Sequence, residues 1–546
     1  MSHYANLSEN VSALDSCALR IYKSTGTSRN QQSAFDRRYK LFKQLKDSIL
    51  RITEGYWELL SVAESNIKRI ARERQTRHYS KADIEKGFSQ AIAGGVGLFS
   101  DGYLNGVSGS LTTIIGNIYP VEYTTKKQSL LNSMIFLGNV LGMLVFGYAC
   151  DKSGRKYSLI VASIFLVVFS ILSAGAYYKG TNEGVINTLI IYRFLLGVEY
   201  PAGSTTISEG AQEMSGKHKH SLFIFLTDFM ICMGFVVAGF VSFVLTSALG
   251  ESQQSVIWRL LLAIGSICPL ILLIVRFRMG EPESYRTYAM KSVRIPYRFV
   301  IKRYWKRLSF ISLGWFMYNF TSYSFGIYFA PVLQSINKDM ALNKIFGWTT
   351  LIYLFYLPGS FFGAILTDYL EPKNVFAIGV FVQGVIGFIM ASNYAALKDN
   401  VPVFVLLYGL FMTFGEFGPG DNIGNISAKA AATPVRGHFY GIAAACGKTG
   451  AFLGSYVFSY IIQRFGGYGT VAGSRGPFYI GSSVVILSGF VSLFFFPKLS
   501  QDCVREENEH FKTWLEEQGF DTQKMGLIYN TQPQSPEEPA ELSEKA

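Results

Sequence analysis

Long apolar segments recur along the chain, and most charged residues lie between them or in the two tails. The segments are about 20 residues long, which is the length that an α-helix needs to cross roughly 30 Å of hydrocarbon. The pattern predicts an all-α membrane protein with twelve transmembrane helices. The predicted spans are 88–116, 129–149, 157–177, 185–207, 221–247, 256–277, 309–331, 346–367, 374–396, 402–424, 437–462 and 478–497.

The composition supports this interpretation. Of the 546 residues 49% are hydrophobic, and 16% are charged, against roughly 25% in soluble proteins. A soluble multidomain enzyme and a disordered chain are therefore excluded. The net charge of +12 lies mainly in the N-terminal tail and in one loop, so we expect no basic face for nucleic acid. The six cysteines are scattered over tails and spans, and their spacing predicts no disulfide framework, metal site or cofactor.

Positive charge marks one side of the membrane. The loop 276–307 holds ten Lys or Arg and two acids, and the short loops 151–156 and 216–220 are also basic. Because basic loops are retained in the cytoplasm, we expect both tails there. The chain then divides into a cytoplasmic N-terminal tail (1–86), an N-terminal six-helix bundle (87–277), a cytoplasmic basic loop (278–308), a C-terminal six-helix bundle (309–497) and a cytoplasmic acidic tail (498–546).

Six spans lie on each side of the long basic loop. Two six-helix halves are typical of transporters built from repeats, with the substrate site near the midplane between the halves. A weak internal similarity supports a repeat, since GYACDKSGRK (147–156) follows span 2 and GAILTDYLEPK (363–373) follows span 8. The sequence therefore predicts a transporter that works by alternating access. We see no nucleophile–base set that would indicate an enzyme.

Charged residues inside the spans are the candidates for function. An ionised side chain at the bilayer centre costs about 2.5–3.5 kcal/mol, so each is expected to face the interior of the bundle. They either line a transport pathway or form ion pairs between helices. No His lies near the middle of a predicted span, which leaves carboxylates as the available proton carriers. The six charged residues singled out as candidates are Asp101, Arg193, Glu199, Asp228, Glu416 and Lys448.

Lys448 is the sharpest single candidate, because no acid lies within a helical turn of it on its own span. A buried ammonium without an internal partner needs an anion, and we expect the substrate to supply it. A lysine binds phosphate as a point charge. In span 7, helical spacing places Trp315, Asn319 and Tyr323 on one face, which either packs or forms a cavity wall.

Two loop motifs resemble those of the major facilitator superfamily. GYACDKSGRK is similar to the pattern G-x-x-x-D-R-x-G-R-K, with Lys152 where Arg is usual, and GEPESYR (280–286) resembles the P-E-S-x-R signature after span 6. The first resemblance implies that Asp151, Gly154 and Arg155 belong to a gating loop.

Four span segments resemble the phosphate:proton symporter branch of that superfamily: LFSDGY, EYPAG, FGPG and GIAAACGKTGA. The resemblance implies that Asp101, Glu199, Tyr200 and Lys448 line the pathway of phosphate and protons. It also implies that Trp315 occupies a cavity position.

Three positions depart from the phosphate branch. Leu104 and Asn319 stand where phosphate symporters usually carry Asp, and Gly420 replaces the Asn that follows F-G-P. These changes suggest a larger pocket with altered charge. The segments SDGYLNG, NFTSYSFG and EFGPGDN look closest to the yeast glycerophosphodiester permeases, which take up glycerophosphoinositol or glycerophosphocholine with protons.

We therefore expect proton-coupled uptake of glycerophosphodiesters across the plasma membrane by a monomer. The phosphodiester is expected to pair with Lys448, with Tyr200, Asn319 and Tyr323 beside it, while Asp101, Glu199 and Asp228 handle protons. A carboxylate among aromatic rings suits a quaternary ammonium, so Glu416 slightly favours glycerophosphocholine over glycerophosphoinositol. Two alternatives stay open, an inorganic phosphate:proton symporter and a nutrient receptor of the same fold that does not transport.

Overall fold

The computed structural model describes residues 81–179, 181–198, 218–278, 285, 288–290, 295–336, 340–520, 522 and 525, with side chains from 92 onward. This part of the chain contains helices and no β-strand. The N-terminal half comprises α3 (Lys81–Ile118), α4 (Thr125–Lys152), α5 (Arg155–Ala174), α6 (Asn182–Gly197), α8 (Lys219–Leu226), α9 (Asp228–Leu249), a short turn η1 (Glu251–Gln253), α10 (Gln254–Ile264) and α11 (Ile267–Arg278).

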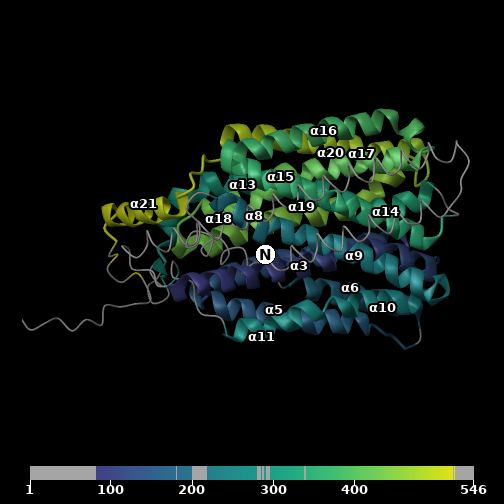
Figure 1. The fold of residues 1–546 in the computed structure, drawn as a ribbon, viewed down its shortest axis with the longest axis horizontal. Helices are drawn as coiled ribbons and strands as arrows, with labels where there is room; N and C mark the ends of the chain where they lie inside the picture. The colour runs from purple at the N-terminus through teal and green to yellow at the C-terminus, as the bar shows by residue number, and fades with distance from the viewer. Residues whose placement is uncertain are drawn as a thin grey trace, which may run out of the picture. The chain divides into compact units, whose positions relative to one another are not determined.

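The C-terminal half follows the same plan. It comprises α13 (Tyr297–Ile336), α14 (Leu342–Leu354), α15 (Tyr356–Leu370), α16 (Pro372–Leu397), α17 (Val401–Gly415), a π-helical turn η2 (Glu416–Gly420), α18 (Asp421–Lys429), a short turn η3 (Thr433–Val435), α19 (Arg436–Arg464), α20 (Val471–Phe495) and α21 (Cys503–Glu517). In Figure 1, α16, α17 and α20 lie on one side and α5, α10 and α11 on the other, with α3, α9 and α19 between them.

Eleven of the twelve predicted spans fall on described helices, span 10 with the turn η2 between its two helices, and span 4 (185–207) is described only as far as 198. The helical fold agrees with the prediction of an all-α membrane protein. Two boundaries differ from the prediction. Helix α13 begins at Tyr297, well inside the predicted basic loop, so its first turns carry basic residues of that loop. The predicted acidic tail contains α21, and its segment from 526 onward lies outside the described residues.

Eight of the described helical segments are long and apolar enough to cross a membrane by length and composition alone. The helices α3, α6, α13 and α19 are not among them. These four carry Asp101, Arg193, Asn319 and Lys448, and α13 and α19 are lowered in hydropathy by the polar residues on their inner faces.

Several pairs of described helices join the two halves, and two of these pairs make the most extensive contacts. Helix α4 packs along α19, and α9 packs against α14. Glycines permit the α4–α19 approach: a side chain at Gly441 would bring its Cβ within 2.5 Å of the Met143 carbonyl oxygen, and one at Gly147 within 2.7 Å of the Gly437 oxygen. Small residues let membrane helices approach closely, and these two glycines do so for this pair.

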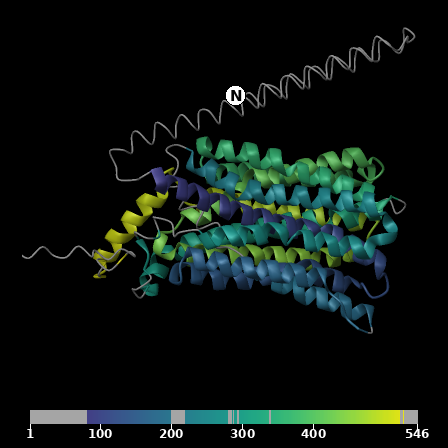
Figure 2. The same ribbon diagram turned by 60° about the horizontal axis from the view of Figure 1, so that its bottom comes forward.

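Helix α21 lies across one end of the bundle, where it is drawn in yellow in Figure 2. Its buried side chains, Val504, Phe511 and Leu515 among them, follow the spacing of one helical face. The Glu507 carboxylate accepts hydrogen bonds from Arg303 (2.7 Å to Nη2), Tyr304 and Arg307, all on α13.

The segment before α21 also reaches the other half. Lys219 of α8 forms an ion pair with Asp502 at 2.5 Å, and the Lys219 main-chain nitrogen donates to Gln501. The tail segment therefore contacts both halves on one side of the bundle.

Candidate functional site

A cavity lies between the two halves, lined on one side by α8 and α9 and on the other by α13, α15, η2, α18 and α19. Its lining is mixed, with tyrosines and phenylalanines alternating with carboxylates, hydroxyls and one lysine. The residues that carry its chemistry are Asp228, Cys232, Trp315, Tyr318, Asn319, Ser322, Tyr323, Tyr356, Glu416, Asp421 and Lys448.

The helices that line the cavity are interrupted at the depth of its acids. Between α8 and α9, Thr227 leaves the helical conformation (φ −117°, ψ −84°), which places Asp228 in the first turn of α9. In span 10, Pro419 lies inside the π-helical turn that begins at Glu416. A proline cannot donate the usual main-chain hydrogen bond, and π-turns of this kind are frequent at functional sites. Both acids therefore stand where a span is irregular.

Lys448 reaches the cavity from α19 and is almost fully buried, with 3% of its surface exposed. Its Nζ donates a hydrogen bond of 2.7 Å to the Tyr323 hydroxyl and lies 4.2 Å from the centre of that ring. The Oδ2 atom of Asp101 on α3 lies 4.0 Å away. Asp101 is held in turn by Asn105, whose Nδ2 donates to Oδ1 at 2.9 Å.

This geometry corrects one expectation. Lys448 is not without an internal acid, because α3 brings Asp101 to the edge of ion-pair distance. The partner comes from a helix distant in the sequence, so the spacing on α19 alone could not reveal it. At 4.0 Å the pair is loose, and the Tyr323 hydroxyl is the closer contact.

Trp315 and Asn319 line the same cavity from α13. The Trp315 ring packs edge-on against Tyr440, with 5.5 Å between ring centres, and lies directly over Gly447, where a Cβ would approach the ring to 2.6 Å. Glycine at 447 therefore gives the indole its place beside the lysine. The predicted cavity wall on this helix face is present.

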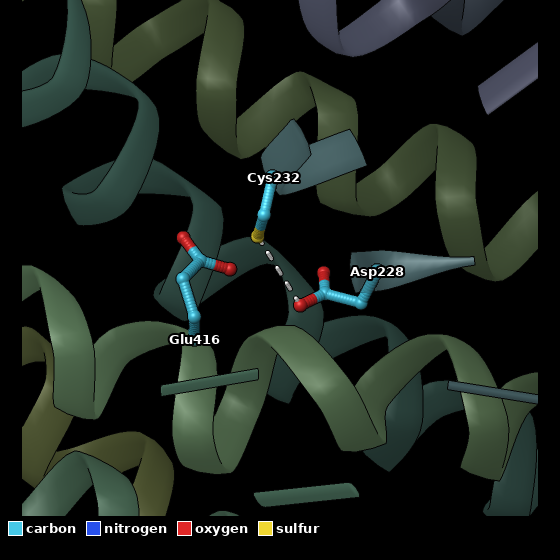
Figure 3. A group of neighbouring side chains, drawn as sticks. All are labelled: Asp228, Cys232 and Glu416. Carbon is cyan, nitrogen blue, oxygen red and sulfur yellow. Dashed lines mark hydrogen bonds between the residues drawn. The ribbon is translucent and has the colours of Figure 1, made fainter. Parts of the chain in front are cut away.

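Three acids, Asp228, Glu416 and Asp421, also line the cavity. Figure 3 shows Asp228 and Cys232 from the N-terminal half and Glu416 pointing toward them from the other half. Ligand atoms of Asp228, Cys232 and Glu416 lie within 4.8 Å of one another, and the Cys232 thiol donates to Asp228 at 3.7 Å. The Tyr318 hydroxyl donates to Glu416 at 3.4 Å. Two carboxylates and a thiol could hold a cation, and the absence of a metal stays a prediction.

Asp421 is the third acid, and sequence reasoning missed it. Its Oδ1 accepts a hydrogen bond of 2.6 Å from Ser360, whereas its buried Oδ2 has no hydrogen-bond partner among the described residues. The signal was available, because Asp421 lies within predicted span 10, five residues after Glu416. Cys232 and Tyr318 were missed as well, since neither carries a charge that marks it within a span.

Gly420 explains how Glu416 fits. A Cβ at position 420 would lie 3.0 Å from the Tyr318 hydroxyl and would collide with the Glu416 Oε2 atom. Glycine at this position therefore leaves the space that the Glu416 carboxylate occupies. Gly420 and Glu416, the two unusual residues of span 10, are therefore linked, because the glycine leaves room for the carboxylate.

The predicted gating loop joins the halves at one end. Asp151 and Arg155, both fully buried, form an ion pair of 2.7 Å. The other contacts of Asp151 are with the first turn of α19: it accepts from the main-chain nitrogens of Gly437 (3.0 Å) and His438 (2.8 Å). Gly154, which lies between Asp151 and Arg155 in the sequence, has φ +108°, a backbone conformation that residues other than glycine rarely adopt.

An equivalent contact occurs at the corresponding position of the C-terminal half. Asp368, near the end of α15, accepts from the main-chain nitrogen (3.3 Å) and hydroxyl of Ser221 in the first turn of α8. Each half thus places an aspartate from its second span at the N-terminus of a helix in the other half, where the helix dipole favours an anion. The weak sequence repeat corresponds to an equivalent structural role.

The expected proton-path and substrate residues Glu199 and Tyr200 lie outside the described residues. Arg193, whose role the sequence left open, is buried on α6 and contacts α3, away from the acids of the cavity. Of the expected site residues, the structure brings together Asp101, Lys448 and Tyr323, and separately Asp228 with Glu416.

Comparisons with known proteins agree with the fold. The family model described as Sugar (and other) transporter matches residues 87–295, and that described as Major Facilitator Superfamily matches residues 314–517. A structure of the proton:xylose symporter XylE bound to 6-bromo-6-deoxy-D-glucose has a TM-score of 0.64 at 15% identity, covering 78% of this chain and 99% of that one. The fold and the matched families define a major facilitator protein that spans the membrane many times.

Three proteins of Candida albicans are similar over most of the chain. The glycerophosphodiester transporter GIT2 is 40% identical, over 80% of this chain and 83% of its own. The glycerophosphocholine permease GIT4 is 39% identical over 82% and 85%, and the major glycerophosphoinositol permease GIT3 is 39% identical over 80% and 83%. The chain therefore belongs to the glycerophosphodiester transporter family of the major facilitator superfamily.

Proposed function

We propose that this protein takes up glycerophosphodiesters together with protons by alternating access, at the plasma membrane and with both termini in the cytoplasm. The observation that carries the proposal is a cavity between the halves whose lining combines Lys448 with three carboxylates, Asp228, Glu416 and Asp421. Such a cavity offers one group for a phosphoryl anion and several for protons.

The anion binds at Lys448. The ammonium is desolvated, and its contacts include the Tyr323 hydroxyl and, at 4.0 Å, Asp101, so a phosphodiester oxygen that reaches it gains a strong charge-assisted hydrogen bond. Asn319 and Tyr323 stand beside it as hydrogen-bond donors. Protonation of Asp101 removes the competing internal charge and leaves the ammonium to the substrate.

Charge balance explains the need for protons. Asp101, Asp228, Glu416 and Asp421 would bring four negative charges against the one positive charge of Lys448 if all were ionised. An anionic substrate would then be repelled, because like charges in a low dielectric are costly. Protons that bind these acids with the substrate remove the repulsion. Each proton that moves inward gains about 2.3 kcal/mol per 100 mV of membrane potential. The potential therefore drives uptake when the protons carried with each substrate bring more positive charge than the substrate brings negative charge.

The headgroup of the substrate faces the acids. Glu416 lies among the rings of Tyr318 and Tyr356, and Phe235 packs against Tyr356 with 5.6 Å between ring centres. A carboxylate with aromatic faces suits a quaternary ammonium, which favours glycerophosphocholine slightly over glycerophosphoinositol. Relatives named for each substrate are equally similar to this chain at 39% identity, so the preference rests on Glu416 alone.

Uptake of radiolabelled substrates by cells that express the chain tests the proposal. Labelled glycerophosphocholine and glycerophosphoinositol should accumulate, an uncoupler should stop accumulation, and unlabelled glycerophosphodiesters should compete better than inorganic phosphate. Stronger competition by phosphate would favour the phosphate:proton symporter. Binding without accumulation in vesicles would favour a receptor. Accumulation that survives the uncoupler would contradict proton coupling.

A further inference from the structure

Arg193 is a fully buried arginine on α6 that the cavity does not use. Its Nη1 donates to the main-chain oxygen of Leu104 at 3.3 Å, and its Nη2 donates to the Ser108 hydroxyl. Its Nε has no hydrogen-bond partner among the described residues, and within that part of the chain no carboxylate lies within 4.0 Å of the guanidinium. A buried guanidinium is costly unless an anion compensates its charge.

Other unpaired donors lie near this arginine. Tyr123 is close enough to Arg193 to interact with it electrostatically, and its buried hydroxyl has no hydrogen-bond partner in the described structure. Asn132 of α4 accepts from Thr112, one helical turn beyond Ser108 on α3, while its buried Nδ2 remains without an acceptor. Buried polar groups are normally paired, and unpaired ones call for an explanation. Donors that share a location with a cation indicate a site for an anion.

The position of this group along α3 separates it from Lys448. Asp101 lies 4.0 Å from Lys448, whereas Arg193 contacts the Leu104 main-chain oxygen and the Ser108 hydroxyl. Three to seven residues of helix correspond to roughly 5–10 Å. By the predicted orientation, with α3 starting in the cytoplasm, the guanidinium lies on the extracellular side of the Lys448 cavity.

Few polar contacts close this outer end. Gln334 donates to Asn117 at 3.1 Å, Gln463 donates to Thr125 at 2.6 Å, and the Tyr353 hydroxyl donates to the Gly106 oxygen at 3.3 Å. Each bond joins the C-terminal half to the N-terminal half. Separation of the halves at this end breaks them and opens the way to the interior from outside.

We propose that Arg193 forms an outer subsite that binds the phosphoryl group of the incoming phosphodiester before the anion passes to Lys448. Two cationic groups at successive depths then give the anion a path from α6 in the N-terminal half to α19 in the C-terminal half. The inference rests on the proposed function in one respect, that the cargo is a phosphodiester anion.

Substitutions at Arg193 and at its neighbour Leu104 test the subsite in the purified full chain reconstituted in liposomes, by exchange of labelled glycerophosphocholine without a proton gradient. R193Q should raise KM about tenfold or more, since hydrogen bonds to charged groups are worth at least one order of magnitude in binding. R193K should raise KM less. L104D should raise KM like R193Q, because a new carboxylate satisfies the guanidinium internally, while L104N, the matched uncharged control, should not.

A purely structural arginine predicts the opposite. L104D would then stabilise the protein against heat and leave KM unchanged, and R193Q would lower thermal stability without an effect on KM. That result would overturn the subsite. The proposed function is judged separately by the wild-type chain: if it exchanges inorganic phosphate but no glycerophosphodiester, the proposed cargo fails, and the same variants measured with phosphate as the probe still decide the subsite. A wild-type chain that exchanges neither anion would overturn both.

Discussion

At the scale of single residues, Lys448 is a cation buried in the cavity. Its contacts include the neutral Tyr323 hydroxyl at 2.7 Å and Asp101 at 4.0 Å. K448A should abolish uptake of glycerophosphodiesters while surface expression stays intact, because no other cation faces the cavity among the described residues. Uptake and surface labelling in the same cells measure this, with K448R as the charge-conserving control. Near-normal transport by K448A would remove its role as the anion site.

Glu416 distinguishes the two headgroups. E416Q keeps the shape and the hydrogen bond from Tyr318 but removes the charge that a quaternary ammonium needs. Glycerophosphocholine uptake should fall about tenfold or more, since a desolvated cation–carboxylate contact is worth a few kcal/mol, and glycerophosphoinositol uptake should fall less. Competition curves with both substrates on one variant give the ratio. Equal losses would dismiss the choline-binding role.

Gly420 offers a second test of the same carboxylate without touching its charge. G420A adds one methyl group where a Cβ would collide with the Glu416 Oε2 atom. We expect glycerophosphocholine uptake to fall in parallel with E416Q, because the carboxylate is displaced from the cavity. G424A is the matched control, since its Cβ would meet nothing closer than the Tyr440 hydroxyl at 3.8 Å. If G420A transports normally, the glycine is only a packing residue.

At the scale of elements, hydrogen bonds to Asp151 connect α4 with the first turn of α19. D151N keeps the size but loses the charge that pairs with Arg155, and removing one partner of a buried ion pair costs about 3–5 kcal/mol. The contact between the halves should loosen on this side. In a chain with Cys232 as its only cysteine, a membrane-impermeant thiol reagent applied from the cytoplasm should then label Cys232 in the cavity several-fold faster.

The repeat supplies an independent comparison for that experiment. D368N removes the corresponding charge at the first turn of α8. D368N should also speed the labelling of Cys232, but by less than D151N. Asp368 has neutral donors and a histidine as partners, whereas Asp151 has a buried arginine. Unchanged Cys232 labelling in both variants would show that these aspartates do not hold the halves together.

The extent of each span was predictable because crossing hydrocarbon demands one long apolar helix, and that demand is local. The interruptions were harder. Pro419 inside span 10 signals an irregular turn, but the break at Thr227 has no proline or glycine beside it and depends on what α8 and α9 pack against.

The sequence predicted which residues belong to the site better than it predicted which of them lie next to one another. Intramembrane charge singles out Lys448 and Glu416 from the sequence alone. That Asp101 would stand beside Lys448, and Asp228 beside Glu416, follows from the packing of helices far apart in the chain. Leu104 illustrates the limit: the sequence marks it as unusual, while its consequence for Arg193 is visible only once α3 and α6 lie together.

At the scale of the whole molecule, α21 connects the C-terminal tail to the bundle through Glu507. Burial alone would raise the pKa of this carboxyl, but hydrogen bonds and charge from Arg307 and Arg303 outweigh burial and hold its pKa below the ordinary 4.5. A lowered pKa stabilises docking above the ordinary value, and the stabilisation is lost as pH falls through the lowered one. The docked helix should therefore persist at neutral pH and detach in acid.

E507Q should detach α21 at neutral pH. Losing hydrogen bonds to two charged partners costs about 1.5–3 kcal/mol, so amide hydrogen exchange of residues 503–517, measured by mass spectrometry, should rise at least tenfold. E509Q, an exposed change on the same helix, is the control. Similar exchange in E507Q and wild-type protein would mean that the apolar face of α21 holds the helix without Glu507.

The modest hydropathy of α13 and α19 bears on biogenesis. A helix that leaves the translocon alone must partition into lipid by its own side chains, and neither of these helices holds a stretch apolar enough to do so readily. Each is followed in the chain by a more apolar helix, α14 after α13 and α20 after α19. We therefore expect α13 and α19 to depend on these neighbours for insertion, and variants that make their inner faces more polar to be produced in lower amounts.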